Sequence, residues 1–457
     1  MMRYIDTVRQ RMRALHRTGA VVALCAATLT LHAQLNEAWI VGYSGWINTN
    51  YDIYMTVDSD GNVYVTGTFN IVGLSGYSAL VTLKYDANGF LRFAQADTLY
   101  AGYARDIAVD SSGNVYVLAG DNYYYYTRVI KYDANGGRRW LRTITSPQTF
   151  PAAFEVDSAG NVYVLATTYS SYDYLILKYD TNGVLLWSQQ YDGGGTETAV
   201  DLALDSAGNV IVTGTSNNDY LTVKYNANGV LLWFRRYDGG GTENAADLTV
   251  DSAGNIIVTG TSNDDYLTLR YDANGNLLWA RRFNVGTDRA TAVTVDSAGN
   301  VYVTGESNGS FATVSYQPNG TQRWVRTSNG GLSQCRPVAV AVDNAGNVYV
   351  AGTGTVSGND TSYLTVKYDA NGNEAAQLYD STLGAERLTA GVLDRAMNLI
   401  VTGFSVDPNS DGYGAEIVTI KYATGAPISN EGDVNGDGCV DDTDLLIVLF
   451  NFGRGCN

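Results

Sequence analysis

The sequence predicts an all-β fold, an eight-bladed β-propeller, from three observations. One turn motif recurs eight times along the 457-residue chain, at intervals close to the length of a four-stranded blade. The composition, with 50 Gly, 34 Tyr and 16% charged residues, is typical of many short strands joined by tight turns. The last copy lacks one strand, and a strand able to replace it lies near the N-terminus.

The recurring motif is D-x-x-G-N followed by alternating apolar residues. We expect its Asp to cap the turn by accepting backbone N–H groups, because a carboxylate repeated in every unit is usually structural. Successive copies lie 52, 47, 48, 46, 45, 47 and 51 residues apart, and the eighth is degenerate, with Met397-Asn398 in place of Gly-Asn. The copies begin at Asp58, Asp110, Asp157, Asp205, Asp251, Asp296, Asp343 and Asp394.

Each unit has the pattern of four strands, which the sixth copy shows in full. The motif at Asp296 separates two runs that alternate with period two, as paired strands do. A second turn, Asn319-Gly320, has the residues that supply positive φ angles in a tight hairpin. The four predicted strands cover residues 292–295, 301–304, 311–316 and 322–326.

A tryptophan recurs on the fourth strand, and its distribution predicts how the ring closes. The eighth unit has no fourth strand after Lys421-Tyr422. Trp39 precedes Asp58 by 19 residues, a spacing that matches the fourth-strand position of other units. The N-terminal strand should therefore complete the eighth blade, which leaves no exposed sheet edge. Fourth-strand positions hold Trp140, Trp187, Trp233, Trp279 and Trp324, with Phe93 in the first unit and Ala376 in the seventh.

The units resemble the bacterial β-propeller repeats known as SBBP repeats. The resemblance rests on fragments such as Asp-Ser-Ala-Gly-Asn-Val at 205–210 and Tyr-Leu-Thr-Val-Lys-Tyr at 220–225, and it covers about residues 35–422. It implies a propeller, and says little about function. The family name implies seven blades, which is the alternative to the eight counted from this sequence.

Residues 1–33 are predicted to be a signal peptide, because five Arg precede an apolar run that is too short to span a bilayer. Both histidines, His16 and His32, fall in this segment. A mature chain without histidine has no imidazole-based triad and no histidine zinc site. It keeps 24 basic and 45 acidic side chains, which makes nucleic acid and anionic membranes poor partners. We expect a secreted or cell-surface protein with no membrane span.

One fragment raises the alternative of an enzyme. Residues 180–187, from Asp180 through Gly183 to Trp187, resemble the tryptophan-docking motif of eight-bladed quinoprotein dehydrogenases. Those enzymes add a vicinal cysteine pair beside the cofactor, whereas this propeller has only Cys335. We therefore expect Trp to pack between blades without a cofactor, and we assign no catalytic residue.

The most variable segments are the loops between second and third strands, and we expect any ligand to bind there. With the N-terminal strand outermost, these loops share one face with the connections between blades. Two near-identical connections, 191–197 and 237–243, add acidic groups to that face. Aromatic rings stack on sugars or anchor proteins, so a glycan or a protein is the expected ligand. The candidate residues are Tyr123, Tyr124, Tyr125, Tyr126, Tyr169, Tyr172, Asp219, Asp265 and Asp360.

The segment 433–444 has the pattern of a calcium loop, with oxygen ligands at positions 1, 3, 5, 9 and 12 and Gly438 at the sharp turn. It resembles a single type I dockerin repeat followed by a short apolar helix, within a module at 432–457 that a linker at 424–431 joins to the propeller at 34–423. A complete dockerin has two repeats, so a cohesin-like partner is only weakly implied. The predicted ligands are Asp433, Asn435, Asp437, the Cys439 carbonyl, Asp441 and Asp444.

Three functions fit the sequence. The favoured one is a secreted, non-catalytic binding or scaffold protein. An extracellular enzyme, either quinoprotein-like or a polysaccharide hydrolase or lyase, and a structural surface-layer component are the alternatives. Cys439 and Cys456 flank the predicted helix and could form a disulfide in an exported protein, which leaves Cys335 unpaired.

Overall fold

The computed structural model forms eight four-stranded antiparallel sheets, and the described residues contain no helix. It describes residues 36–45, 52–70, 77–100, 102–121, 123, 125–358, 360–380, 385–406 and 415–423. Seven sheets are built from consecutive strands, and the eighth combines strands from both ends of the described chain. This confirms the prediction of eight blades over seven.

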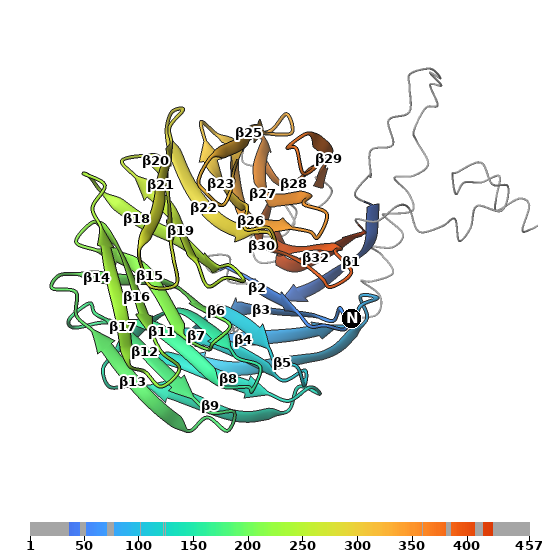
Figure 1. Cartoon of the computed structure of the whole chain (residues 1–457). Coiled ribbons are helices and arrows are strands. Elements are labelled where there is room, and N and C mark those ends of the chain that lie inside the picture. Colours follow the sequence, from blue (N-terminus) through green and yellow to red (C-terminus); the bar gives the residue numbers. More distant parts are fainter. Residues whose placement is uncertain are drawn as a thin grey trace, which may run out of the picture. The chain divides into compact units, whose positions relative to one another are not determined.

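The first four blades follow one another along the chain, each running from an inner strand to an outer strand (Figure 1). Their strands are β2 (Tyr54–Val57), β3 (Val63–Asn70), β4 (Tyr77–Tyr85), β5 (Leu91–Tyr100); β6 (Gly102–Val109), β7 (Val115–Asp121), β8 (Thr127–Tyr132), β9 (Arg138–Ile144); β10 (Thr149–Val156), β11 (Val162–Thr168), β12 (Tyr174–Tyr179), β13 (Leu185–Tyr191); and β14 (Glu197–Leu204), β15 (Val210–Ser216), β16 (Asp219–Tyr225), β17 (Leu231–Tyr237).

The next three blades repeat this arrangement, and the eighth takes its outer strand, β1, from the N-terminal side. Their strands are β18 (Glu243–Val250), β19 (Ile256–Ser262), β20 (Asp265–Tyr271), β21 (Leu277–Phe283); β22 (Asp288–Val295), β23 (Val301–Ser307), β24 (Ser310–Tyr316), β25 (Gln322–Ser328); β26 (Ser333–Val342), β27 (Val348–Ser357), β28 (Asp360–Tyr368), β29 (Glu374–Asp380); and β30 (Ala385–Leu393), β31 (Leu399–Val406), β32 (Ala415–Ala423), β1 (Asn36–Gly45).

The N-terminal strand closes the ring as the Trp spacing predicts. β1 pairs antiparallel with β32, with Asn36 opposite Ala423 and Gly45 opposite Ala415 (Figure 1). On the inner side, Thr389 Oγ1 of the eighth blade donates to the Ile53 carbonyl, 2.7 Å away and directly before the first blade's inner strand. The N-terminal strand therefore completes the eighth blade, and a hydrogen bond on the inner side joins that blade to the first.

The D-x-x-G-N turns follow the expected capping chemistry. In the first copy, Asp58 Oδ1 accepts the backbone N–H groups of Asp60 and Asn62 at 3.0 and 2.9 Å, while Oδ2 accepts the Asn62 side chain at 2.7 Å. Gly61 at the fourth position has a φ of 78°. Met397 occupies this left-handed position in the degenerate copy, with a φ of 64°.

The second hairpin turn corrects one detail of the sequence prediction. Only Gly320 of the Asn319-Gly320 pair has a positive φ, at 81°, and the register shifts between Ser315 and Tyr316. This is a type I turn followed by a left-handed glycine and a bulge, which needs one positive φ and not two. Turns with two successive positive φ angles instead join second to third strands, as at Asn217-Asn218.

Fourth-strand tryptophans join six of the eight blades to the next, as the docking interpretation predicts. Trp187 Nε1 donates to the Ala227 carbonyl at 3.1 Å, in the second hairpin turn of the following blade. A Cβ on Gly229 would lie 2.8 Å from the Trp187 ring, so the ring requires a glycine in that turn. The same Nε1 bond is made by Trp39, Trp140, Trp233, Trp279 and Trp324.

A cation lies near the end of the third strand in every blade except the sixth, which has Ser315 there, and it has one of two arrangements. Where the second strand carries Tyr at its second position, the cation lies over that ring, as Lys178 lies 4.7 Å from the Tyr163 ring centroid. The Tyr hydroxyl then donates to the turn Asp, at 3.2 Å for Tyr163 and Asp157. This pattern keeps the turn carboxylate satisfied by a neutral donor.

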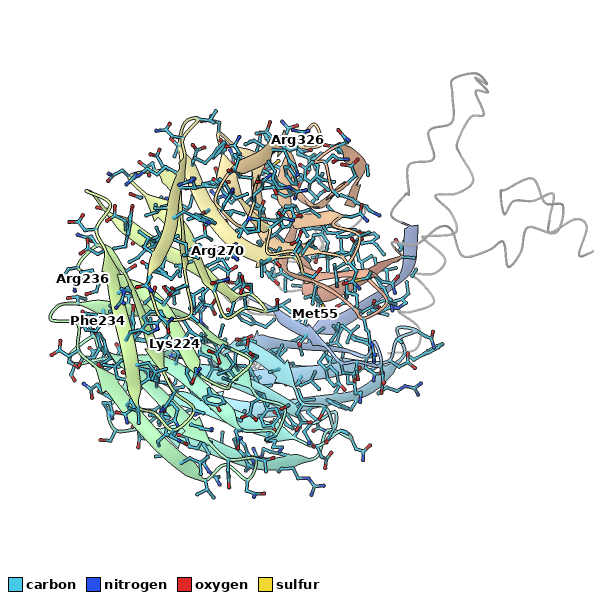
Figure 2. All side chains as sticks on the ribbon, viewed as in Figure 1. Met55, Lys224, Phe234, Arg236, Arg270 and Arg326 are labelled. Carbon is cyan, nitrogen blue, oxygen red and sulfur yellow. The ribbon has the colours of Figure 1, made fainter. Side chains whose placement is uncertain are left out.

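Where Ile replaces that Tyr, the cation itself pairs with the turn Asp. Lys224 Nζ lies 2.9 Å from Asp205 Oδ2, beside Ile211, and Arg270 pairs with Asp251 in the next blade (Figure 2). Hydrogen bonds and this cation hold the pKa of Asp205 below its usual value despite burial. Each turn Asp thus has a structural partner, a Tyr hydroxyl or a buried cation.

Candidate binding site

The loops between second and third strands share one face of the ring with the connections between blades. This follows from the strand order, because antiparallel strands reverse direction at every turn and β1 is the outermost strand of its sheet. We call this surface the loop face, and it carries the sequence-predicted ligand residues that the structure describes. The D-x-x-G-N turns lie on the opposite face, as predicted.

An aromatic cluster joins the second and third blades on the loop face. The rings of Tyr125 and Tyr169 stack with centroids 4.2 Å apart and planes 10° from parallel. Phe150 packs against both rings, 5.2 Å from Tyr125 and 5.7 Å from Tyr169. Tyr125 has a φ of 56°, a left-handed conformation uncommon for residues other than glycine. Sequence reasoning predicted both tyrosines but missed Phe150, which lies in a strand.

Other predicted tyrosines differ in accessibility. Tyr123 is 62% exposed and Tyr172 42% exposed, so both present rings to solvent. Tyr126 is half-buried, and Tyr124 lies outside the described residues. The backbone carbonyl of Tyr172 accepts the N–H of Glu197 at 2.7 Å, which ties this loop to the following blade connection.

The predicted aspartates lie apart from the aromatic cluster. Asp219 and Asp265 open the third strands of the fourth and fifth blades, where Arg236 and Arg282 of the outer strands lie 3.6 Å from them. Asp360 is exposed and begins β28 of the seventh blade. These residues share the loop face but belong to three different blades.

Two groups of three carboxylates occupy the near-identical blade connections. One oxygen from each of Asp173, Asp192 and Glu197 lies within 4.8 Å of the other two, and Asp219, Asp238 and Glu243 repeat this geometry one blade later. Glu197 and Glu243 are completely buried. Sequence reasoning noted the acidic loops, but it missed Asp173 and the convergence, because each group draws on two blades.

A second set of acids, on the inner strands, was not predicted at all. Asp106, Asp201 and Asp247 occupy equivalent inner-strand positions in three blades. Asp201 Oδ2 accepts the N–H of Leu248 at 3.0 Å, and Asp247 Oδ2 accepts that of Val293 at 2.6 Å, so each carboxylate joins its blade to the next. The sequence feature that could have predicted these acids is an acidic residue within a strand whose other residues alternate between apolar and polar.

Acidic side chains on the inner strands have raised pKa values. Desolvation raises the pKa of Glu155 to about 8, and the charges of Asp106 and Asp201 add to this shift. The pKa of Asp106 is raised to about 7, mainly by burial. Glu155 is nevertheless open to solvent on one side, because it lines a hollow of about 640 Å³ beside the turns at Asp157 and Asp205.

The predicted calcium loop, 433–444, and its helix lie outside the described residues. The same holds for residues 1–33, and for Cys439 and Cys456. Cys335 is described as a free, buried thiol. Among the described residues, none belongs to a helix of the length and apolarity needed to cross a membrane.

Comparisons with known proteins agree with this architecture. Residues 279–312 match the family model described as a β-propeller repeat, SBBP. A search of curated proteins yields no match. Among solved structures, the Dos1 propeller aligns with a TM-score of 0.57 at 12% identity, over 86% of this chain and 96% of that one. Sqt1 from Chaetomium thermophilum aligns with a TM-score of 0.56 at 10% identity, over 84% and 98%.

Fold and repeat match together define an eight-bladed β-propeller repeat protein. A further structure similar to it is Sqt1 bound to the N-terminus of the ribosomal protein L10, with a TM-score of 0.54 at 10% identity over 81% of this chain and 98% of that one. At these identities the similarity establishes the fold alone.

Proposed function

We propose that this chain is an exported, non-catalytic binding protein whose loop face holds a polypeptide partner. The observation that carries the proposal is the aromatic cluster of Tyr125, Phe150 and Tyr169. Tyr169 is 38% exposed, and Tyr123, two residues before Tyr125 in the sequence, is 62% exposed. Exposed aromatic rings on a rigid scaffold supply large contact area at low entropic cost, which is why they are enriched in binding hot spots.

The charge of the loop face favours a basic partner. The carboxylate groups around Glu197 and Glu243 lie on this face, and the whole chain has a formal net charge of −17. Complementary charge raises association rates and disfavours acidic competitors. A Lys- or Arg-rich segment with an apolar anchor is therefore the expected ligand.

The repeated aspartates support a non-catalytic function. In Asp58 one oxygen accepts two backbone N–H groups, and the other accepts Asn62 and the Tyr64 hydroxyl at 2.7 and 2.8 Å. A carboxylate engaged in this way is a poor nucleophile or base. Sqt1 with the bound L10 N-terminus offers a precedent for a propeller that holds a peptide segment.

A peptide array tests the proposal, with basic, neutral and acidic peptides that carry the same aromatic anchors. Basic peptides should bind, and Tyr123→Ala with Tyr169→Ala should weaken that binding at least tenfold. Phe90→Ala is the matched control, since Phe90 is 65% exposed in a turn on the opposite face. Equal binding by the loop-face variant and the native protein contradicts the proposal.

A glycan is the second candidate, which the exposed rings of Tyr123 and Tyr172 favour, because sugars bind flat against accessible aromatic faces. A glycan array with product analysis separates the outcomes. Retention without cleavage supports a glycan-binding protein. Product release that a loop carboxylate mutation abolishes shows an enzyme.

The C-terminal segment adds a separate proposal, that Asp433, Asn435, Asp437, the Cys439 carbonyl, Asp441 and Asp444 bind calcium. The support is their spacing in the sequence, with oxygen ligands at the positions a calcium loop requires. A cohesin-like partner for this single repeat is the weaker extension of that resemblance.

A further inference from the structure

The carboxylates of Asp173, Asp192 and Glu197 converge from three elements of two neighbouring blades. Asp173 directly precedes β12, Asp192 directly follows β13, and Glu197 is the first residue of β14. One oxygen of each lies within 4.8 Å of the other two. We call this group the first triad, and Asp219, Asp238 and Glu243 the second triad.

The first triad contains a buried carboxylate oxygen with no protein partner. Glu197 is 0% exposed, and Asp173 only 5% exposed. Ser216 Oγ donates to Glu197 Oε1 at 2.6 Å, whereas Glu197 Oε2 has no hydrogen-bond partner among the described residues. A buried anionic oxygen without a donor is costly, and a bound cation would remove that cost.

The two triads differ in the residue that the outer strand places beside them. At the second triad this residue is Arg236 of β17, whose guanidinium lies 3.6 Å from Asp219 (Figure 2). At the first triad the equivalent residue of β13 is Gln190, whose amide hydrogen-bonds to Asp173. The protein thus supplies its own cation to one triad and a neutral amide to the other.

Arg236 also lies beside the first triad, but its contacts there are not with the carboxylates. It donates to the Gly193 carbonyl at 3.1 Å and to Ser216 Oγ. Within the described part of the chain, no ion pair engages Asp173, Asp192 or Glu197. Three carboxylates therefore face one another without a directly paired protein cation.

The ligand atoms indicate the kind of ion. Three carboxylate oxygens within 4.8 Å of one another are close enough to share one ion. Calcium takes six to eight oxygen ligands at about 2.3–2.6 Å in flexible geometry, whereas magnesium demands a near-ideal octahedron at about 2.0–2.1 Å. A site assembled from two blades suits the more tolerant ion, calcium. The Gln190 side chain could turn its amide oxygen toward such an ion as a neutral ligand.

From these contacts we propose that the first triad binds one calcium ion on the propeller, independently of the C-terminal loop. The ion joins the third and fourth blades, because Asp173 and Asp192 belong to the third blade and Glu197 to the fourth. Glu243 Oε2 of the second triad is equally unpartnered among the described residues, but Arg236 lies 3.6 Å from Asp219, so this triad binds calcium more weakly.

Calorimetric titration of the full chain with CaCl₂ tests the proposal, in a background of Asp433→Ala and Asp437→Ala that disables the C-terminal loop. One site should remain, with a Kd of about 10⁻⁴–10⁻³ M, as in other extracellular calcium modules. Glu197→Gln preserves size and the Ser216 hydrogen bond, and should weaken this binding at least tenfold. Magnesium should bind more weakly than calcium.

Two matched variants complete the design. Gln190→Arg copies the second triad's arrangement into the first, and should also weaken calcium binding at least tenfold. Glu243→Gln removes the equivalent carboxylate of the second triad and should leave binding unchanged. Melting temperatures without calcium verify that each variant folds. Native affinity in Glu197→Gln or Gln190→Arg, or no calcium uptake by the background protein at millimolar concentration, overturns the proposal.

Discussion

The indole Nε1 of Trp39 donates a hydrogen bond to the Ala87 carbonyl, 3.0 Å away, although the two residues belong to the last and first blades. Lys421 Nζ reaches the same carbonyl at 3.3 Å. Equivalent bonds join consecutive blades elsewhere, but here they hold the first blade to the one blade that is assembled from both ends of the described chain. Trp39 therefore contributes directly to closure of the outer rim.

Replacing Trp39 should open this contact. Trp39→Ala removes a half-buried indole and its hydrogen bond, and we expect the free energy of unfolding to fall by about 2–3 kcal/mol. Trp39→Phe keeps most of the ring and should cost about 1 kcal/mol. Chemical denaturation measures both values. If Trp39→Ala unfolds at the native midpoint, β1 does not hold the ring closed.

The two arrangements of the buried cation predict different costs for the same substitution. Lys224→Met leaves Asp205 buried without its 2.9 Å partner and should cost about 3–5 kcal/mol. Lys178→Met leaves Asp157 bonded to Tyr163 and should cost about 1–2 kcal/mol. Denaturation of both variants gives the comparison. Adding Asp205→Asn to Lys224→Met should recover part of the lost stability. Equal costs for the two lysine substitutions would contradict the distinction between a turn Asp paired with a cation and one bonded to a Tyr hydroxyl.

Stability should decline as pH rises from about 4 to about 8. Glu155 and Asp106 have pKa values raised to about 8 and about 7, so the folded protein retains protons that the unfolded chain has released. Deprotonation then places charge beside Asp201, and Arg105 is the cation that faces Asp106. Glu155→Gln should flatten the decline in thermal melts across this range. Asp360→Asn, at an exposed site, should leave it unchanged.

The degenerate turn offers a stabilising substitution. Met397 has a φ of 64°, where the other seven copies have glycine. Met397→Gly should raise the free energy of unfolding by about 0.5–1 kcal/mol, because relief of left-handed strain exceeds the added chain entropy of glycine. The adjacent Ala396→Gly, at a position without positive φ, should lower stability by a similar amount. Chemical denaturation measures both variants. A midpoint that rises for Met397→Gly and falls for Ala396→Gly, relative to the native protein, confirms the interpretation.

The C-terminal calcium loop can be tested separately from the propeller. In a full chain carrying Glu197→Gln, calcium should still bind at 433–444, and Asp433→Ala with Asp437→Ala should abolish that binding because two anionic ligands are lost. Titration under oxidising and reducing conditions shows whether a Cys439–Cys456 bridge contributes. Absence of binding in both conditions contradicts the calcium assignment.

The fold was predictable because its determinants are local and repeated. Asp58 and its equivalents begin a five-residue motif that predicts each turn on its own. The spacing from Trp39 to Asp58 predicts the closing strand. The first triad was not predictable, since Asp173 and Glu197 are distant along the chain and meet only when two blades pack. Asp106, Asp201 and Asp247 were missed for a different reason. The alternation of a strand shows which face a residue lies on, but it does not show which groups of the neighbouring blades surround it.

The pairing of β1 with β32 also determines how the molecule responds to tension. Asn36 lies opposite Ala423, so the described chain enters and leaves the eighth blade at the same end of one strand pair. A force that separates these two points loads the hydrogen bonds between β1 and β32 one after another, like a zipper. Such a pair opens at lower force than strands sheared along their length, where all bonds resist together. The seam that completes the ring is thus also its point of mechanical release.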